Sequence, residues 1–332
     1  MAIKTTVVGS YPVPDWLAAL PYEQALLDAM RVVFKIQEEA GIDLVADGEL
    51  YRFDVNHPDT NGMIEYFVKP LGNVRSALGR ADVALFRRDQ GMSFRARPSA
   101  VVEGPLDEGT LDLPADCRRA RSLTRAPLKF TLTGPHMLCK TLLDRHYGSR
   151  PELCLTLAEV LASQVADLDA EVVQVDEANL PGHPEESEWA LAGINRVLDA
   201  VRTTGAVHLC FGNYGGQSIQ QGTWEKLLAY LNGLHCDHVL LELARRGNWE
   251  LPFLRGLSPQ IKLGLGVVDI KSNVVESAEQ IARRIEEAAK ALGEERIAYI
   301  NPDCGFWMLK RSVADRKIRA LVEGRDLYAG RR

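Results

Sequence analysis

Short apolar runs alternate with longer amphipathic segments along most of the chain. Eight of these runs are three to six residues long, continuous, and rich in Val, Ile and Leu. Strands that are buried on both faces of a parallel sheet have this pattern. The predicted strands are 3–8, 44–46, 128–132, 172–175, 207–210, 239–241, 263–268 and 297–300.

Helical periodicity is clear in several of the segments between these runs. Residues 22–40 carry apolar side chains at helical spacing, and Gly41 follows as a C-cap. Residues 151–168 have an apolar stripe of the same period. A third helix is predicted over 277–292, with Ser277 as its N-cap.

Eight strands, nearly all followed by a helix, favour a (β/α)8 TIM barrel over a doubly wound sheet. One segment interrupts this alternation. Residues 51–125 are polar and rich in Arg, Gly and Pro, and their pattern predicts few helices. We interpret them as an insertion after the second strand, in the form of a hairpin or a lid over the site. The whole chain, 1–332, is predicted to be one barrel domain that includes this insertion.

Composition excludes several classes of protein. The chain has 39 Lys and Arg against 45 Asp and Glu, which gives a net charge of −6. This balance, without a basic block, argues against nucleic acid as a partner. The sequence also has no uninterrupted run of about 18 apolar residues, the length needed to cross a membrane. The six cysteines are scattered without the spacing of a disulfide scaffold, so we expect a reducing, cytoplasmic location.

Polar residues follow the predicted strands at their carboxyl ends, where barrel enzymes place their active sites. The fold would therefore gather residues that are distant in sequence. These residues are Ser10, Asp47, Glu49, Asp176, Glu177, His208, Cys210, Glu242, Asp269, Asn301, Asp303 and Cys304.

A metal site is indicated by the fifth of these strands. Alternate residues of a strand point the same way, so His208 and Cys210 can present imidazole and thiolate to one point. Cys304 and Glu242 would complete a tetrahedral set, and this mixture of ligands suits Zn²⁺. The alternative is that the cysteines are small core residues and that His208 is a buried, hydrogen-bonded imidazole.

Two other patterns are less informative. The cluster from His235 to His238 precedes the sixth strand, so it would lie at the opposite end of the barrel as a solvated loop. Gly264 and Gly266 resemble a phosphate loop, but no helix start with the right spacing follows. Relief of crowding inside a barrel explains them better.

The sequence resembles the catalytic barrel of cobalamin-independent methionine synthase, one of the zinc-dependent thiol alkyltransferases on a uroporphyrinogen-decarboxylase-like barrel. The resemblance covers essentially the whole chain and includes the Glu242 strand. The motifs that carry it are TTVVGSYP at 5–12, DGE at 47–49, VVQVDE at 172–177, VHLC at 207–210, GLGVVDI at 264–270 and NPDCG at 301–305.

This resemblance implies a site and an activity. It implies zinc ligands at His208, Cys210, Glu242 and Cys304. It implies that the amino acid part of homocysteine is bound by Ser10, Glu49 and Asp176. The implied reaction is transfer of a methyl group to the homocysteine thiol, which gives methionine. Complete members of the family carry a second, N-terminal barrel, so the expected match is to the single-barrel branch.

Zinc would convert the substrate thiol into a nucleophile. A free thiol with a pKa of about 8.5 is mostly protonated at neutral pH and therefore reacts poorly. Coordination removes that proton. Asp176 and Glu49 would be the catalytic carboxylates that accept the substrate ammonium. Alternatively, Glu49 is an ion-pair partner of Arg52, and Asp176 is a strand-end cap.

The methyl donor stays open between a methylated corrinoid, free or on a corrinoid protein, and a folate, since the run from Ala178 to His183 departs from the family sequence. Three other functions also remain. The first is zinc-dependent alkylation of another small thiol, for example by opening of an epoxide. The second is a metal-free decarboxylase or lyase on the same barrel. The third is a zinc-storing or sensing protein without catalysis.

Overall fold

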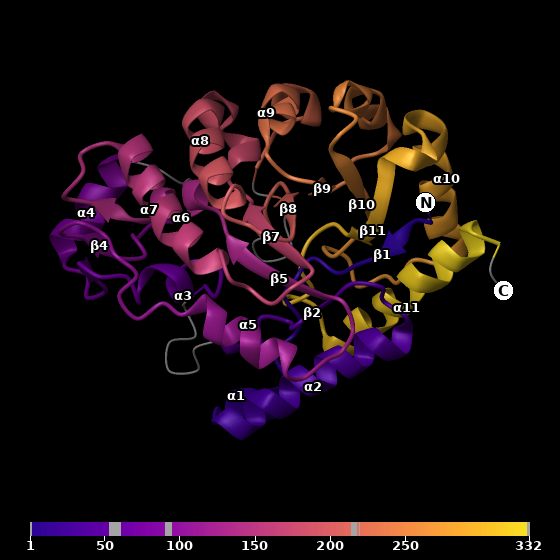
Figure 1. Cartoon of the computed structure of the whole chain (residues 1–332), viewed down its shortest axis with the longest axis horizontal. Coiled ribbons are helices and arrows are strands. Elements are labelled where there is room, and N and C mark those ends of the chain that lie inside the picture. The colour runs from indigo at the N-terminus through magenta and orange to yellow at the C-terminus, as the bar shows by residue number, and fades with distance from the viewer. Residues whose placement is uncertain (1, 53–60, 90–94, 214–217, 219, 331–332) are drawn as a thin grey trace.

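The computed structural model describes residues 2–52, 61–89, 95–213, 218 and 220–330. A curled sheet of eight parallel strands lies at its centre (Figure 1). Its two edge strands approach one another, because Thr6 and Leu44 form a parallel bridge between them. In spatial order the strands are β1 (Lys4–Thr5), β11 (Ile297–Pro302), β10 (Lys262–Val268), β9 (His238–Leu241), β8 (Thr204–Leu209), β7 (Val172–Glu177), β5 (Leu128–Thr133) and β2 (Val45–Ala46).

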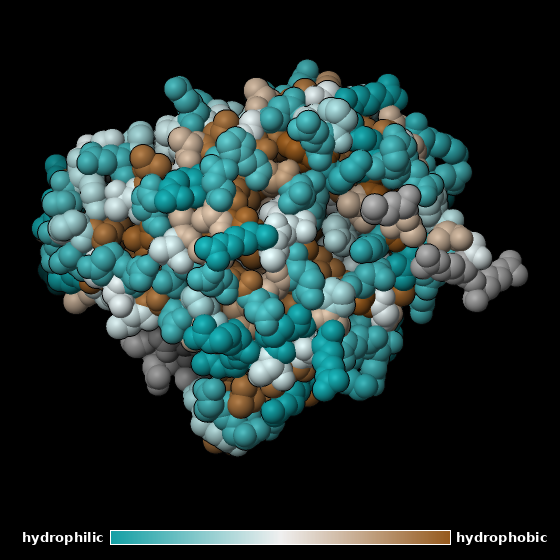
Figure 2. Space-filling view, viewed as in Figure 1, coloured by the Kyte–Doolittle hydropathy of each residue, from teal (hydrophilic) through white to brown (hydrophobic). Residues whose placement is uncertain are grey.

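Helices surround this sheet on its outside (Figure 1). Neighbouring helices pack in pairs, including α7 with α8 and α10 with α11. The face shown in Figure 2 is largely hydrophilic, with small apolar areas between charged side chains, as expected for helices that bury one face. The helices are α1 (Asp15–Ala19), α2 (Glu23–Ala40), α5 (Leu113–Arg121), α6 (Pro135–Thr141), α7 (Arg150–Val165), α8 (Ser187–Leu198), α9 (Leu228–Gly233), α10 (Ala278–Leu292) and α11 (Arg311–Tyr328).

All eight predicted strands belong to this sheet, so the predicted α/β class with a parallel sheet is confirmed. The three predicted helices are present as well. Gly41 ends α2 in the left-handed conformation, with φ of 87°. Ser277 caps α10 in a capping box with Gln280. No helix among the described residues is long and apolar enough to cross a membrane.

The sequence predicts few helices in the segment 51–125, and here the structure differs from the prediction. The segment contains α3 (Glu65–Val68), α4 (Arg80–Asp89) and α5. Exposed Arg side chains on α4 and α5, such as Arg87 and Arg118, obscure their helical pattern in the sequence. Two short strands, β3 (Val74–Arg75) and β4 (Val101–Val102), form a hairpin-like antiparallel pair, and β6 (Leu143–Asp144) from outside the segment extends it. Residues 53–60 and 90–94 of the prediction lie outside the described residues.

Polar side chains cross the interior of the curled sheet and connect distant strands. The Gln174 amide on β7 donates to the Val8 carbonyl at 2.9 Å and to Asp176 Oδ1 at 2.7 Å. Lys129 on β5 donates to the carbonyl of Val7. Burial lowers the pKa of Lys129 to about 7. These bonds fix the first strand against β5 and β7, and they orient Asp176.

The capping box of α10 provides a test of the fold. Ser277 Oγ accepts the Gln280 amide, and Gln280 Oε1 accepts the Ser277 amide at 2.8 Å. We expect Ser277→Ala to lower the free energy of unfolding by about 1 kcal/mol, because it leaves a helix donor without a partner. Urea denaturation measures this change. Ser277→Asp, which retains a capping oxygen, should stay close to the wild type, and equal losses in both variants would contradict the capping role.

Candidate metal centre

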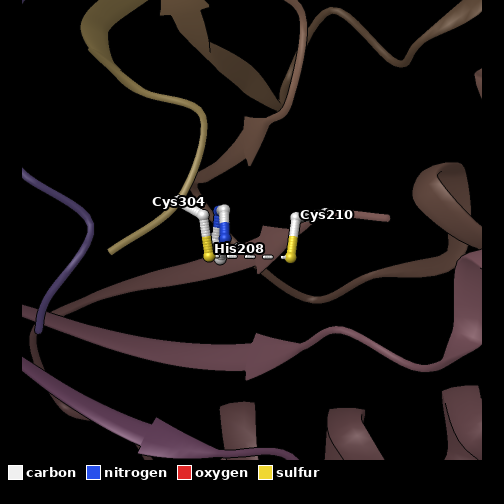
Figure 3. Close-up of side chains that lie close together, drawn as sticks. All are labelled: His208, Cys210 and Cys304. Atoms are coloured by element: carbon white, nitrogen blue, oxygen red, sulfur yellow. Dashed lines mark hydrogen bonds between the residues drawn. The ribbon is translucent and has the colours of Figure 1, made fainter. Parts of the chain in front are cut away.

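Three potential metal ligands converge at the carboxyl end of the sheet. His208 lies near the end of β8, Cys210 follows two residues later, and Cys304 follows β11. One ligand atom from each residue lies within 4.8 Å of those of the other two. The two sulfur atoms are 3.8 Å apart (Figure 3). The structure therefore brings together three of the four predicted metal ligands.

The chemistry of this group fits a metal ion such as zinc. His208 is buried, yet neither ring nitrogen has a hydrogen-bond partner among the described residues, which is costly for a polar group. The nearby Cys304 thiol and burial hold the pKa of Cys210 well above its usual range. A bound divalent cation would reverse that effect, since it stabilises thiolates and takes up an imidazole lone pair. Two sulfurs and one nitrogen are the donors that zinc prefers.

Glu242, the fourth predicted ligand, lies outside this group of three. It directly follows β9, and its side chain is 1% exposed. Its Oε1 accepts a hydrogen bond from Lys271 Nζ at 2.7 Å, and its Oε2 accepts the backbone amide of Phe211 at 3.0 Å. The carboxylate thus has two partners within the chain, and its predicted role as a ligand stays a prediction.

Glu49 and Ser10 lie next to the strand ends, each against a glycine. Glu49 adopts an unusual positive φ of 59°. Its Oε1 would lie 2.1 Å from a Cβ at Gly9, and Ser10 Oγ would lie 1.9 Å from a Cβ at Gly305. Gly305 directly follows Cys304, so Ser10 borders the loop that carries the second thiol. Only residues without side chains allow these close approaches.

Asp176 occupies the adjoining end of β7 and pairs in register with His208. Burial, opposed by the charge of His208 and reinforced by the negative charge of Glu49, raises the pKa of this carboxyl to about 7. The Gln174 amide is its hydrogen-bond partner. Two carboxylates, Asp176 and Glu49, therefore face the same end of the sheet, where a cationic group would stabilise both.

The ion pair of Glu49 with Arg52, considered from the sequence, is present. Arg52 Nη1 lies 3.5 Å from Glu49 Oε1, and Thr131 Oγ1 donates to the same oxygen at 2.6 Å. Arg52 Nη2 donates to the Thr131 carbonyl at 2.5 Å, and its guanidinium lies 5.4 Å from the Tyr66 ring centre and 5.0 Å from that of Phe67. Within the part of the chain that the structure describes, its Nε and Nη1 have no hydrogen-bond partner. The pair holds the Glu49 carboxylate and leaves donors free beside it.

Of the two patterns that we set aside, the glycines behave as expected, but the cluster from His235 to His238 is only partly a solvated loop. His235 and Asp237 are exposed at the start of β9, whereas His238 is buried with its ring 4.9 Å from that of Tyr299. None of them belongs to the metal-ligand group. A Cβ at Gly266 would lie 2.2 Å from Asp303 Oδ1, so this glycine does relieve crowding.

Sequence reasoning missed a buried network beside the candidate centre. His136 at the start of α6 contacts Glu177 Oε1 through Nδ1 at 3.2 Å and Glu186 Oε2 through Nε2 at 2.8 Å. Lys140 contacts the other Glu186 oxygen at 2.6 Å, and the Trp189 ring lies 4.6 Å from the imidazole. A Gly-Pro helix start directly after a strand was the available signal. The network fixes Glu177, the residue after Asp176.

Comparison with known proteins identifies the family. A family model described as the catalytic domain of cobalamin-independent synthase matches residues 3–325. A methionine synthase from Thermococcus kodakarensis is 31% identical over 98% of this chain and 93% of its own length. A methionine synthase from Pyrococcus horikoshii is 28% identical over 98% and 92%.

A solved structure agrees with these relatives. A B12-independent methionine synthase from Shewanella sp. W3-18-1, in complex with selenomethionine, superposes with a TM-score of 0.83 at 25% identity, over 99% of this chain and 98% of that one. The chain belongs to the cobalamin-independent synthase catalytic-domain family. The family predicted from the sequence motifs is confirmed, and so is the predicted class of enzyme, a methyltransferase of the methionine synthase type.

The His136 network predicts a pH dependence of stability. Burial favours the neutral ring, but the carboxylates of Glu177 and Glu186 outweigh it and raise the pKa of His136 from 6.5 to about 9. The charged ring therefore stabilises the folded chain fully below about pH 6.5. This contribution is lost as the pH rises through about 9, and each tenfold gain in proton affinity corresponds to about 1.4 kcal/mol.

We expect urea unfolding between pH 6.5 and 9 to show a decline in stability that His136→Gln removes. His235→Gln is the matched control, because His235 is exposed and pairs with Asp199 at 2.8 Å. An unchanged slope in His136→Gln would show that the ring is neutral in the folded chain.

Proposed function

We propose that this chain transfers a methyl group to the thiol of homocysteine at a zinc ion held by His208, Cys210, Cys304 and Glu242. The observation that carries the proposal is the convergence of the first three side chains, with a buried imidazole that has no other partner among the residues that the structure describes. Membership of the family supports the same reaction. The product is methionine.

The chain's own residues prepare the thiol for attack on a methyl carbon. Zinc supplies a positive charge that lowers the pKa of a bound thiol, so the substrate sulfur reacts as a thiolate. Cys210 and Cys304 bring two negative charges to the site, which keeps the substrate sulfur electron-rich. His208 adds a neutral ligand from β8, the strand that Cys210 directly follows.

The amino acid part of homocysteine binds at the adjoining strand ends. Asp176 and Glu49 accept hydrogen bonds from the ammonium group, and the hydroxyl and backbone at Ser10 receive the carboxylate. The geometry that supports this assignment is the position of Ser10 against Gly305, next to the Cys304 thiol. The thiol of the substrate then extends toward the metal ligands.

We also propose the finer features of the fold and setting. The curled sheet is a closed (β/α)8 barrel within one domain, 1–332, and the Thr6–Leu44 bridge supports closure. The six free cysteines support a cytoplasmic setting. Residues 51–125 are an insertion in the same domain.

The decisive assay is a matrix of thiols against donors. Homocysteine and simpler thiols are combined with methylcobalamin, methyl-folates and small epoxides, and mass spectrometry identifies the products. Zinc content is measured in parallel on protein purified without chelator. Methionine formed from homocysteine supports the proposal. The donor with which it forms shows whether the methyl group comes from a corrinoid or a folate. A chain without stoichiometric zinc would contradict it.

The proposed metal ligands give one prediction of this function. Cys210→Ser and Cys304→Ser should lose most of the zinc and nearly all activity but remain folded, because both residues lie beyond the strand ends. Metal analysis and circular dichroism measure the two effects. Cys236→Ser is the matched control, since Cys236 precedes β9 at the opposite end of the sheet. Normal turnover in either ligand variant would exclude that cysteine from the site.

The proposed binding site for the amino acid part of homocysteine gives another prediction. Asp176→Asn should lower kcat/KM for homocysteine by about ten- to hundredfold, because a charge-assisted hydrogen bond contributes about 1.5–3 kcal/mol. A thiol without the amino acid part should be affected much less, and zinc content should not change. Equal losses for both thiols would mean that Asp176 supports the site in general and does not bind the ammonium.

A further inference from the structure

A buried ion pair stands next to the candidate metal centre. Lys271 Nζ lies 2.7 Å from Glu242 Oε1, and the two side chains are each 1% exposed. Lys271 is positioned by its own loop after β10, where its backbone amide donates to Asp269 Oδ1 at 2.8 Å. This ammonium is therefore a fixed feature of the carboxyl end of the sheet.

Backbone contacts tie Glu242 to both cysteine-bearing loops. Its Oε2 accepts the amide of Phe211, the residue that follows Cys210. The amides of Leu243 and Ala244, directly after Glu242, donate to Oδ1 of Asp303 at 2.9 Å and 2.8 Å. Asp303 precedes Cys304. The segment that carries Glu242 thus contacts both cysteine-bearing loops, although its carboxylate lies outside the group of three ligands.

A buried ion pair is costly to form, because both charges lose their hydration. Lys271 does balance the carboxylate, yet a neutral pair would fill the same space more cheaply. The ion pair would have a function if Glu242 were a metal ligand that exchanges for the substrate thiol. A carboxylate that leaves a metal in a dry site needs another cation at hydrogen-bond distance, and Lys271 is at that distance already.

We infer that Lys271 is a positioning residue that takes over the Glu242 carboxylate when the substrate thiol binds. This inference rests on the proposed zinc site. One metal–oxygen bond to Glu242 is lost, one metal–sulfur bond to the substrate is formed, and the thiol proton passes to solvent. No oxidation or reduction is involved. Lys271 thereby makes Glu242 the ligand that exchanges, while His208 and the two cysteines remain.

Zinc-edge X-ray absorption on the zinc-loaded full chain, with and without homocysteine, tests this role. The wild type should gain a sulfur scatterer and lose an oxygen scatterer. Lys271→Met should keep the oxygen and bind homocysteine about tenfold more weakly or worse by calorimetry, with zinc content unchanged. Lys271→Arg, which retains the charge, should respond like the wild type. Lys262→Met, at the other end of β10, is the matched control.

A double variant separates this role from a purely structural one. In Lys271→Met with Glu242→Gln, no carboxylate competes for the metal, so homocysteine binding should recover toward the wild-type value. An unaltered affinity in Lys271→Met, or no recovery in the double variant, would overturn the inference. A wild-type spectrum that gains no sulfur contradicts the proposed function itself, whereas a normal wild-type response leaves only Lys271 in question.

Discussion

The parallel direction of all eight strands in the central sheet determines where the chemistry of this chain can occur. Parallel pairing brings every carboxyl end to one side, so residues more than a hundred positions apart become neighbours. Asp176 and His208 are paired across β7 and β8. Cys304 reaches the same place because β11 ends beside β10. Given this arrangement, a single His-x-Cys pair at the end of one strand needs only one further thiol to form a potential metal-ligand group.

Close packing at these strand ends depends on a few residues with little or no side chain. Gly9 and Gly305 leave room for Glu49 and Ser10, and Gly266 leaves room for Asp303. Glu49 also adopts a left-handed backbone conformation that non-glycine residues rarely take. Strained backbone and close approaches are typical of functional sites, where the surrounding structure compensates for them. Here they place the Glu49 carboxylate against Gly9 and the Ser10 hydroxyl beside the loop that carries Cys304.

The sequence was sufficient to predict the strands and the convergence of His208, Cys210 and Cys304, for specific physical reasons. Buried parallel strands are short and continuously apolar, so each of the eight could be recognised locally. His208 and Cys210 share one face of a strand through simple alternation. The helices at 80–89 and 113–121 were missed because charged residues dominate them, although Asp112 caps the second one by accepting the Ala115 amide. The partners of His136 and of Glu242 could not be predicted, since they lie 29 to 50 positions away and meet only through the tertiary fold.

Charge balance at the carboxyl end points to what is missing from the chain itself. Glu242 has Lys271 as its cation, Glu177 and Glu186 have His136, and Glu49 has Arg52. Asp176 has no direct ion pair with any described residue. Burial raises its pKa to about 7, although the charges of His208 and Arg52 oppose this rise, and Lys129 is also close enough to interact with it. A buried carboxylate without a directly paired cation is unfavourable unless a ligand supplies one. Under the proposed function the ammonium of homocysteine is that cation, so the substrate completes a pattern of paired charges that the other carboxylates already follow.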